Sequence, residues 1–172
     1  MEIPGSLQTI SEIGVAIAGF SGLIVAFRRN TGPLTYVEKY RLKVLLNLAL
    51  GAMFLAFVPE IAHQLGVSPR RLWRLSGGVL AIYSIVFIVW WLVASRRLMR
   101  LVPEIFHWSA FSRMAAGHVI VILLQLGVTF ALLDGYATGI YLLGLVWYLM
   151  HAAQQFTRML FIQPKTGAAG DT

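Results

Sequence analysis

The stretch that decides the fold is VIVILLQLGVTFALLDGYATGIYLLGLVWYLM, residues 119–150. It contains two apolar runs that are separated by Asp134 and Gly135. About 20 apolar residues cross a bilayer as an α-helix, so the apolar region over residues 116–157 is too long for a single crossing. Because Asp-Gly is a strong turn signal, the stretch predicts two antiparallel transmembrane helices joined by a tight turn.

The composition of the whole chain agrees with a membrane environment. Of its 172 residues, 58% are hydrophobic and 12% are charged, and the mean hydropathy is +0.75. A soluble domain carries about 25% charged residues, which is enough polar surface to cover it in water. We therefore predict an all-α integral membrane protein in contact with the lipid bilayer, and we expect it in the inner (plasma) membrane of a bacterium.

Outward from the central hairpin, the apolar runs divide the chain into a five-transmembrane-helix bundle that forms a single domain over residues 1–172. The expected spans are roughly 9–27, 43–65, 74–95, 116–133 and 137–157. Residues 96–115 are predicted to form a cytoplasmic amphipathic connector, or in part an extension of the fourth span that Pro103 starts. Residues 163–172 are predicted to be a disordered tail.

Lysine and arginine residues indicate the orientation of the bundle. Eleven of the 14 lie on one side, namely Arg28, Arg29, Lys39, Arg41, Lys43, Arg96, Arg97, Arg100, Arg113, Arg158 and Lys165. Only Arg70, Arg71 and Arg74 lie on the other side. The positive-inside rule then places the N-terminus outside and the C-terminus in the cytoplasm. These short basic clusters have no interleaved aromatic stripe, so no nucleic-acid partner is expected.

Three short motifs predict where helices begin. Thr9 with Glu12 and Thr35 with Glu38 fit the capping box, in which a hydroxyl and a carboxylate bind the free amides of a first turn. Ser68 before Pro69 fits an N-cap followed by proline at the first helical position. The second helix is therefore expected to begin near Tyr36, ahead of its membrane portion.

The pattern V-P-E-I-x-H occurs twice, in FVPEIAH at 57–63 and in LVPEIFH at 101–107. The second copy fits a helix start, because proline and glutamate are favourable in a first turn. Ending the second span before Pro59 would make it too short, so we expect its helix to continue and the Leu55 carbonyl to lose its usual donor. Common ancestry of the two copies, as in the inverted repeats of transporters, is the alternative interpretation.

Four polar residues are predicted at the outer end of the bundle: Glu12, Glu60, His63 and Asp134. Ionisable groups within a span are costly and often mark a functional site. Glu60 and His63 are three residues apart on one helix face, so we expect them to be close enough to meet. E-x-x-H is also the spacing of bundle metal ligands, but such sites need further carboxylates from facing helices, so the pair is a weak metal candidate only. Three of the four also have a structural interpretation, because Glu12 fits a cap, Asp134 a turn and His63 the end of a helix. For Glu60 a functional or buried-network role is favoured.

A second polar set is predicted in the cytoplasmic half of the membrane: Asn47, His118, His151, Gln154 and Gln155, with Gln125 deeper. Because the last two spans are antiparallel, His118 and His151 are expected at similar depth. Together with the outer set these residues would line a polar path across the bilayer. The alternative, favoured by the sequence, is that they form interhelical hydrogen bonds.

Small residues at Gly14, Ala18 and Gly22 recur at every fourth position of the first span. Such spacing lets helix backbones approach closely in lipid. With Ala16 and Gly19 on other sides of the helix, it predicts that this span lies inside the bundle.

These patterns favour a homo-oligomeric channel for ions or protons, with its polar site in the outer half of the bundle. The alternative is a non-catalytic accessory subunit, sensor or assembly factor that binds other membrane subunits; a carrier is a third possibility. No catalytic motif is evident, so no enzyme activity and no cofactor are expected. The absence of cysteine also excludes disulfides and thiolate metal sites.

Overall fold

The computed structural model describes residues 4–28, 33–103 and 108–161. These residues form five α-helices and contain no β-strand. The helices are α1 (Ser6–Arg28), α2 (Tyr36–Gln64), α3 (Pro69–Leu101), α4 (Trp108–Thr129) and α5 (Ala137–Phe161), with a short 3-10 helix η3 (Asp134–Tyr136) before α5. Five helical segments are long and apolar enough to cross a membrane, as the sequence predicts.

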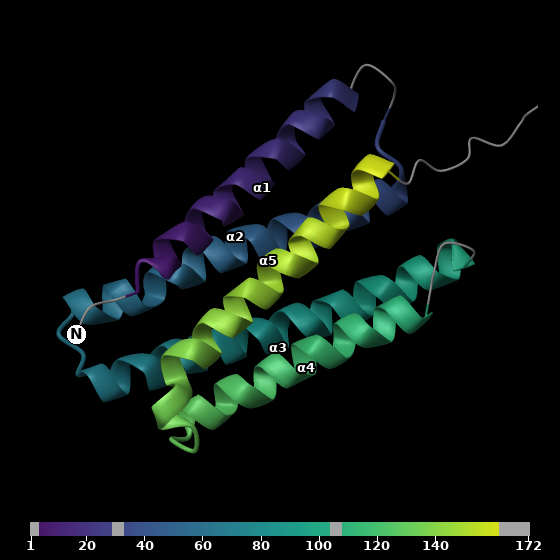
Figure 1. The fold of residues 1–172 in the computed structure, drawn as a ribbon. Coiled ribbons are helices and arrows are strands. Elements are labelled where there is room, and N and C mark those ends of the chain that lie inside the picture. Colours follow the sequence, from purple (N-terminus) through teal and green to yellow (C-terminus); the bar gives the residue numbers. More distant parts are fainter. Residues whose placement is uncertain (1–3, 29–32, 104–107, 162–172) are drawn as a thin grey trace, which may run out of the picture.

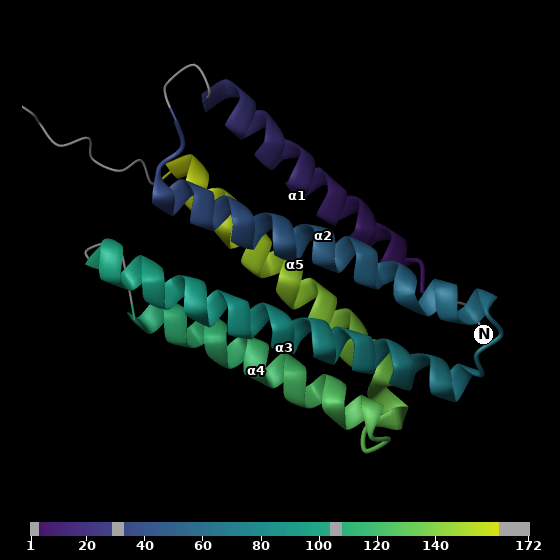
Figure 2. The same ribbon diagram turned by 180° about the vertical axis from the view of Figure 1, so that it is seen from behind.

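The five helices run alternately up and down and form one bundle (Figure 1). Helix α1 lies along α2, and α3 lies along α4, as the views from both sides show (Figures 1 and 2). Helix α5 packs against all four other helices and so forms the centre of the bundle. Its buried side chains include Tyr141, Leu145 and Tyr148.

Helix α1 lies at the edge of the bundle, so the prediction of an interior first span is wrong. It packs against α2 and α5, while large apolar side chains such as Phe20 and Leu23 are exposed. Small residues on several sides of a helix permit close contacts there, but they do not require a neighbour on each side. In a bilayer, the exposed apolar face of α1 is compatible with lipid contact.

The helices differ from the predicted spans mainly at their ends. Helix α4 ends at Thr129, and residues 130–133 form a turn in which Ala131 has a positive φ of 67°. Residues 96–101 of the predicted connector belong to α3, and residues 108–115 belong to α4. The remainder of the second V-P-E-I-x-H copy from Glu104 on, and the tail at 163–172, lie outside the described residues.

Two of the three predicted helix starts are confirmed. Thr35 and Glu38 form a complete capping box at the start of α2. Ser68 is the N-cap of α3 with proline next to it, although its hydroxyl makes no capping hydrogen bond. The Thr9–Glu12 box is wrong because α1 already begins at Ser6, which places both residues inside the helix.

Helix α2 continues through Pro59 to Gln64, as predicted. Because Pro59 has no amide hydrogen, the Leu55 carbonyl lacks the donor that the helix usually supplies. The Tyr141 hydroxyl of α5 donates to this carbonyl at 2.5 Å, and Tyr141 is fully buried. The hydrogen bond therefore satisfies the carbonyl that proline leaves free and joins α2 to the central helix.

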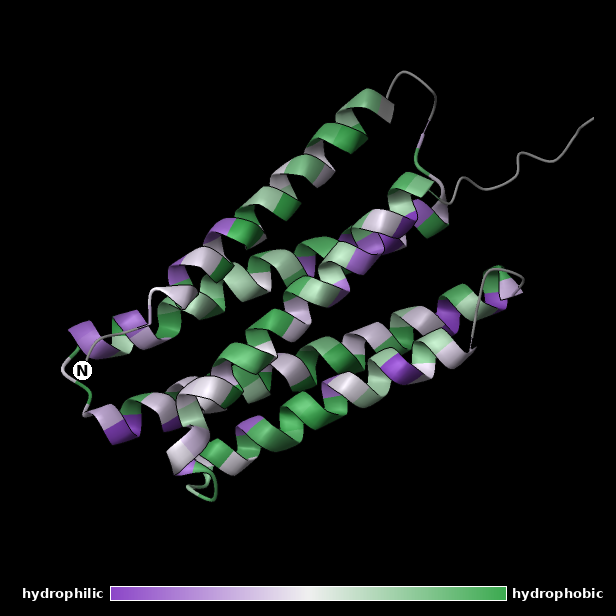
Figure 3. Cartoon of the chain, viewed as in Figure 1, coloured by the Kyte–Doolittle hydropathy of each residue, from purple (hydrophilic) through white to green (hydrophobic). Residues whose placement is uncertain are grey.

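Hydrophobic residues cover most of each helix, and hydrophilic residues lie mainly toward the helix ends (Figure 3). One end of the bundle contains the start of α2, the end of α3, the start of α4 and the end of α5 (Figure 1). We call it the basic end, because it carries Lys39, Arg41, Lys43, Arg96, Arg97, Arg100, Arg113 and Arg158. The opposite end contains the α2–α3 and α4–α5 turns.

Candidate functional site

Two histidines meet in the half of the bundle nearer the basic end. His118 from α4 and His151 from α5 are both 0% exposed, and His118 Nε2 lies 2.9 Å from His151 Nδ1. The sequence placed them at similar depth, and the structure brings them into direct contact. Aromatic rings from α3 and α5 surround the pair: Phe87, Trp91, Trp147 and Tyr148.

Glycines allow α4 and α5 to approach this closely. At Gly144 an added Cβ would lie 2.9 Å from both the Gln125 amide nitrogen and a methyl group of Leu80. At Gly117, next to His118, the ring of Trp147 occupies the space that a Cβ would need. A side chain at either position would therefore force these neighbouring side chains to shift.

The orientation of the Gln155 amide sets the direction of the hydrogen bonds at the pair when both rings are neutral. The Gln155 amide Nε2 lies 3.1 Å from His151 Nε2 and is a donor only, so this ring nitrogen accepts. Neutral His151 then carries its proton on Nδ1 and donates to His118 Nε2. His118 in turn carries its proton on Nδ1, an atom with no hydrogen-bond partner among the described residues. An unpaired imidazolium would be costly at this depth, so both rings are neutral at rest.

Gln125 lies two helical turns beyond His118 on α4 and is also 0% exposed. Its amide donates to the Ile140 carbonyl at 2.8 Å, while its side-chain oxygen Oε1 has no partner among the described residues. At 1.5 Å rise per residue, His118 and Gln125 are about 10 Å apart along the helix. The buried donor His118 Nδ1 and the buried acceptor Gln125 Oε1 thus lie on the same face of α4, and neither has a partner among the described residues.

A second buried pair lies on the same side of α5. The hydroxyls of Tyr148 and Ser84 are 2.5 Å apart, and the Ser84 hydroxyl also donates to the Leu80 carbonyl. The ring of Tyr148 contacts the ring of His118. Sequence reasoning missed this pair because serine and tyrosine are common in membrane helices, although Ser76, Ser84 and Ser95 follow one face of α3 and are all fully buried.

The four residues predicted at the outer end do lie at the end opposite the basic end, but they do not form one cluster. Glu12 and Glu60 line a surface groove of about 530 Å³ between α1 and α2. Each carboxylate accepts a hydrogen bond from a glutamine of its own helix, Gln8 at 2.9 Å and Gln64 at 2.8 Å respectively. Glu60 is half-buried and Glu12 is exposed.

His63 is exposed, and Glu60 is engaged with Gln64 rather than with His63. The described residues contain no group of three or more side chains that could hold a metal ion. Among the described residues, Glu60 and His63 therefore have no third side chain beside them that could bind a metal ion.

Asp134 pairs with Arg74 of α3 across the end of the bundle. Arg74 Nε donates to Asp134 Oδ1 at 3.0 Å, and Arg74 Nη2 makes a second, shorter contact with Oδ2. Both side chains are about one-third exposed, at 34% and 33%. Asp134 thus anchors the α4–α5 turn to α3 instead of joining the glutamates.

The remaining predicted residues lie apart from the histidines. Asn47 is exposed and donates to the Lys43 carbonyl of its own helix at 2.9 Å. Gly14 lies at the α1–α2 contact, where a Cβ would be 2.7 Å from the Ala49 carbonyl oxygen. Ala18 packs against the core, whereas Gly22 has open space around it.

No protein-family model matches this chain, and neither the curated proteins nor the solved structures include one with detectable similarity to it.

Proposed function

We propose that this protein crosses the inner (plasma) membrane five times and conducts protons through a relay formed by His118 and His151. The N-terminus is outside and the basic end faces the cytoplasm, because positively charged loops remain on that side. The observation that carries the proposal is the direct imidazole–imidazole hydrogen bond of 2.9 Å between two fully buried rings. Ionisable groups placed within membrane helices typically mark ion or proton pathways.

Imidazole suits a relay because one ring nitrogen can accept a proton while the other releases one. A proton that arrives at His151 Nε2 would displace the Gln155 amide, and His151 would pass the proton on its Nδ1 to His118 Nε2. His118 would then release the proton on its own Nδ1. One proton enters and one leaves, and both rings end as the other neutral tautomer.

Gln155 fits both states of this relay. In the resting state its amide nitrogen donates to His151 Nε2. After a transfer, His151 Nε2 carries a proton, and rotation of the amide by 180° would present the Gln155 oxygen as its acceptor. Beyond His118, the side-chain oxygen of Gln125 is the buried acceptor that the same face of α4 provides.

The test is proton flux into liposomes that contain the purified protein, driven by a potassium diffusion potential and read with an internal pH dye. We expect His118→Gln and His151→Gln to lower the flux at least tenfold, and the exposed His63→Gln to leave it within twofold of the original. Nitrogen NMR of the histidines in the same samples checks for the N–H···N hydrogen bond. Wild-type liposomes without flux at either sign of the potential would contradict the proposal, as would equal flux in all variants.

The groove between α1 and α2 favours a second candidate, a non-catalytic accessory subunit. Glu12 and Glu60 line it, and their hydrogen-bond partners among the described residues are glutamines of their own helices. A basic residue of a neighbouring membrane subunit, or of a second copy of this chain, would therefore complement them. Native mass spectrometry after mild extraction tests this. A stoichiometric complex that Glu12→Gln with Glu60→Gln disrupts would favour this candidate, and a monomer would exclude both the accessory role and self-association.

A further inference from the structure

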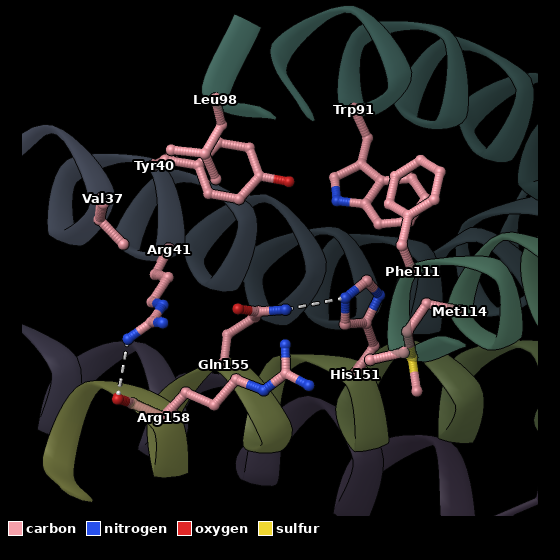
Figure 4. A pocket seen from close by; sticks show the side chains of 11 residues that line it. Val37, Tyr40, Arg41, Trp91, Leu98, Phe111, Met114, His151, Gln155 and Arg158 are labelled. Atoms are coloured by element: carbon pink, nitrogen blue, oxygen red, sulfur yellow. Dashed lines mark hydrogen bonds between the residues drawn. The ribbon is translucent and has the colours of Figure 1, made fainter. Parts of the chain in front are cut away.

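A small pocket opens where the histidine relay reaches the basic end of the bundle. It has a volume of about 80 Å³ and lies among α2, α3, α4 and α5 (Figure 4). His151 and Gln155 form part of its wall, together with two arginines, Arg41 of α2 and Arg158 of α5. Its apolar wall consists of Val37, Trp91, Leu98, Ala110, Phe111 and Met114.

The two arginines bring positive charge into this pocket, and none of the described residues that line it carries a carboxylate. Arg41 is only 8% exposed, and its Nη1 donates to the Arg158 backbone carbonyl at 3.1 Å. Among the described residues this is the one hydrogen bond that the Arg41 side chain makes, so most of the donors of its guanidinium are unused there. The charges of Arg41 and Arg158 also repel each other. Among the described residues, no carboxylate forms an ion pair with either arginine; the ion pair found there joins Arg74 to Asp134 at the other end.

A buried charge without a counter-charge is costly. The buried Arg41, with the partly exposed Arg158 at the same pocket, therefore points to an anion that completes the arrangement. The nearest carboxylate along α2 is that of Glu38, which accepts hydrogen bonds from Thr35 in the capping box. The aromatic ring of Tyr40, whose hydroxyl is hydrogen-bonded to Ser95 at 2.7 Å, closes the pocket beside Arg41.

The size and the walls of the pocket define the chemical class of the anion. About 80 Å³ accommodates a group of a few non-hydrogen atoms, whereas pockets for drug-sized ligands measure about 300–1,000 Å³. Two guanidiniums match the several oxygens of a tetrahedral phosphate, to which arginine donates in a bidentate manner. Basic pockets between membrane helices on the cytoplasmic side commonly bind lipid phosphates.

We propose that Arg41 and Arg158 bind a phosphate oxyanion in this pocket, either the headgroup phosphate of an anionic phospholipid or free inorganic phosphate. The effect of this phosphate on proton transfer rests on the proposed proton relay. The positive charge of Arg158 repels a proton on His151, whose ring lines the same pocket. A bound phosphate would offset that repulsion and would therefore favour proton entry into the relay.

Binding is tested with the full-length chain in nanodiscs and needs no flux. The first sample contains phosphatidylcholine with a small fraction of phosphatidic acid, and native mass spectrometry counts retained phosphatidic acid. The second contains phosphatidylcholine alone, titrated with inorganic phosphate and followed by phosphorus NMR. Binding in the first sample alone identifies the lipid as the source, and binding in the second identifies free phosphate.

The decisive variant is Arg41→Gln with Arg158→Gln. Its matched control is Arg100→Gln with Arg113→Gln, which removes the same charge from exposed positions at the same end. We expect the dissociation constant to rise at least tenfold in the pocket variant and less than twofold in the control. Equal weakening in both variants, or no binding of either probe to the unchanged chain, would overturn the proposal.

Two milder variants keep the proposal testable if the double variant fails to fold. Arg158→Gln alone changes a partly exposed side chain, and Arg41→Lys keeps the charge while removing the planar donor group. We expect each to weaken binding by at least threefold with circular dichroism unchanged, and unchanged affinity in both would contradict the site. Phosphate binding without proton flux would refute the relay alone, whereas flux without binding would refute the phosphate site alone.

Discussion

Polar side chains lie within long apolar helices in two regions of the bundle, the contact between α4 and α5 at its centre and the groove between α1 and α2. The two regions are organised differently. At the centre, His118, His151 and Gln155 are buried and hydrogen-bonded to one another across two helices. In the groove, Glu12 and Glu60 accept hydrogen bonds from glutamines one turn away on their own helices.

This difference shows that depth along a helix does not decide which polar residues work together. A side chain at the right depth contributes to a relay only if its helix face turns toward another polar face. Helix α5 turns its polar face inward because it is surrounded by four helices, whereas α1 has few neighbours. We therefore expect substitutions at the centre to have large effects and those in the groove to have small ones.

The largest effect is expected from a glycine substitution at the centre. Gly144→Val would place new atoms against Gln125 and Leu80, and should lower the free energy of unfolding by about 3 kcal/mol. Gly22→Val on α1, where nothing lies within 4 Å of the added carbon, should change it by less than about 0.5 kcal/mol. Unfolding by SDS in mixed micelles measures both values. Similar values for the two variants would show that centre and edge are equally tolerant.

Next in size is the loss of the Tyr141 hydroxyl. Tyr141→Phe leaves the Leu55 carbonyl buried without a donor and should cost about 1–2 kcal/mol, compared with almost nothing for the exposed Tyr136→Phe. Pro59→Ala restores an amide donor to the same carbonyl, so Tyr141→Phe should cost clearly less in that background. The same unfolding assay completes this double-mutant cycle. If Tyr141→Phe cost the same free energy of unfolding with proline or alanine at position 59, the Tyr141 hydroxyl would not be compensating for the missing proline amide.

In the groove, Glu60→Gln should change stability by less than about 0.5 kcal/mol, since the glutamine oxygen can still accept from Gln64. Proton flux should remain within twofold of the original. The measurement is the liposome assay used for the histidine variants. If flux instead fell as far as in His151→Gln, the groove would belong to the pathway and the contrast between the two regions would disappear.

The smallest effect is expected at the Arg74–Asp134 ion pair, because both side chains are partly exposed to solvent. Arg74→Gln should lower the thermal midpoint slightly in about 0.1 M NaCl, and the difference should shrink in about 1 M NaCl as salt screens the pair. Asp134→Asn should behave in the same way. A difference independent of salt would indicate packing of the α4–α5 turn rather than charge.

Much of the local structure could be predicted from single motifs. The Thr35–Glu38 capping box, proline after the Ser68 N-cap and the passage of α2 through Pro59 depend only on neighbouring residues, and all three are confirmed. The Thr9–Glu12 box fits the same pattern but is wrong, since the amides of α1 are already helical from Ser6. A motif shows that a cap is possible, and the preceding residues decide whether it is used.

The candidate site was predictable only in part. Two histidines on antiparallel helices joined by a short turn must lie at similar depth, so the His118–His151 pair was within reach of the sequence. The approach of Arg41 to Arg158 was not, because the two residues are 117 positions apart and both were interpreted as markers of topology. Likewise, nothing in the sequence indicates that the donor for the Leu55 carbonyl comes from Tyr141.

The sequence alone determined that five apolar helices form, where their turns fall and which end is basic, because hydropathy, turn residues and charge act through the local chain and its solvent. Only the tertiary structure decided that α5 lies at the centre, that the glutamates line an outer groove and that two arginines share a pocket with His151. These features depend on which helix faces meet. Side-chain packing across the bundle sets that choice, and the order of residues along a single helix does not reveal it.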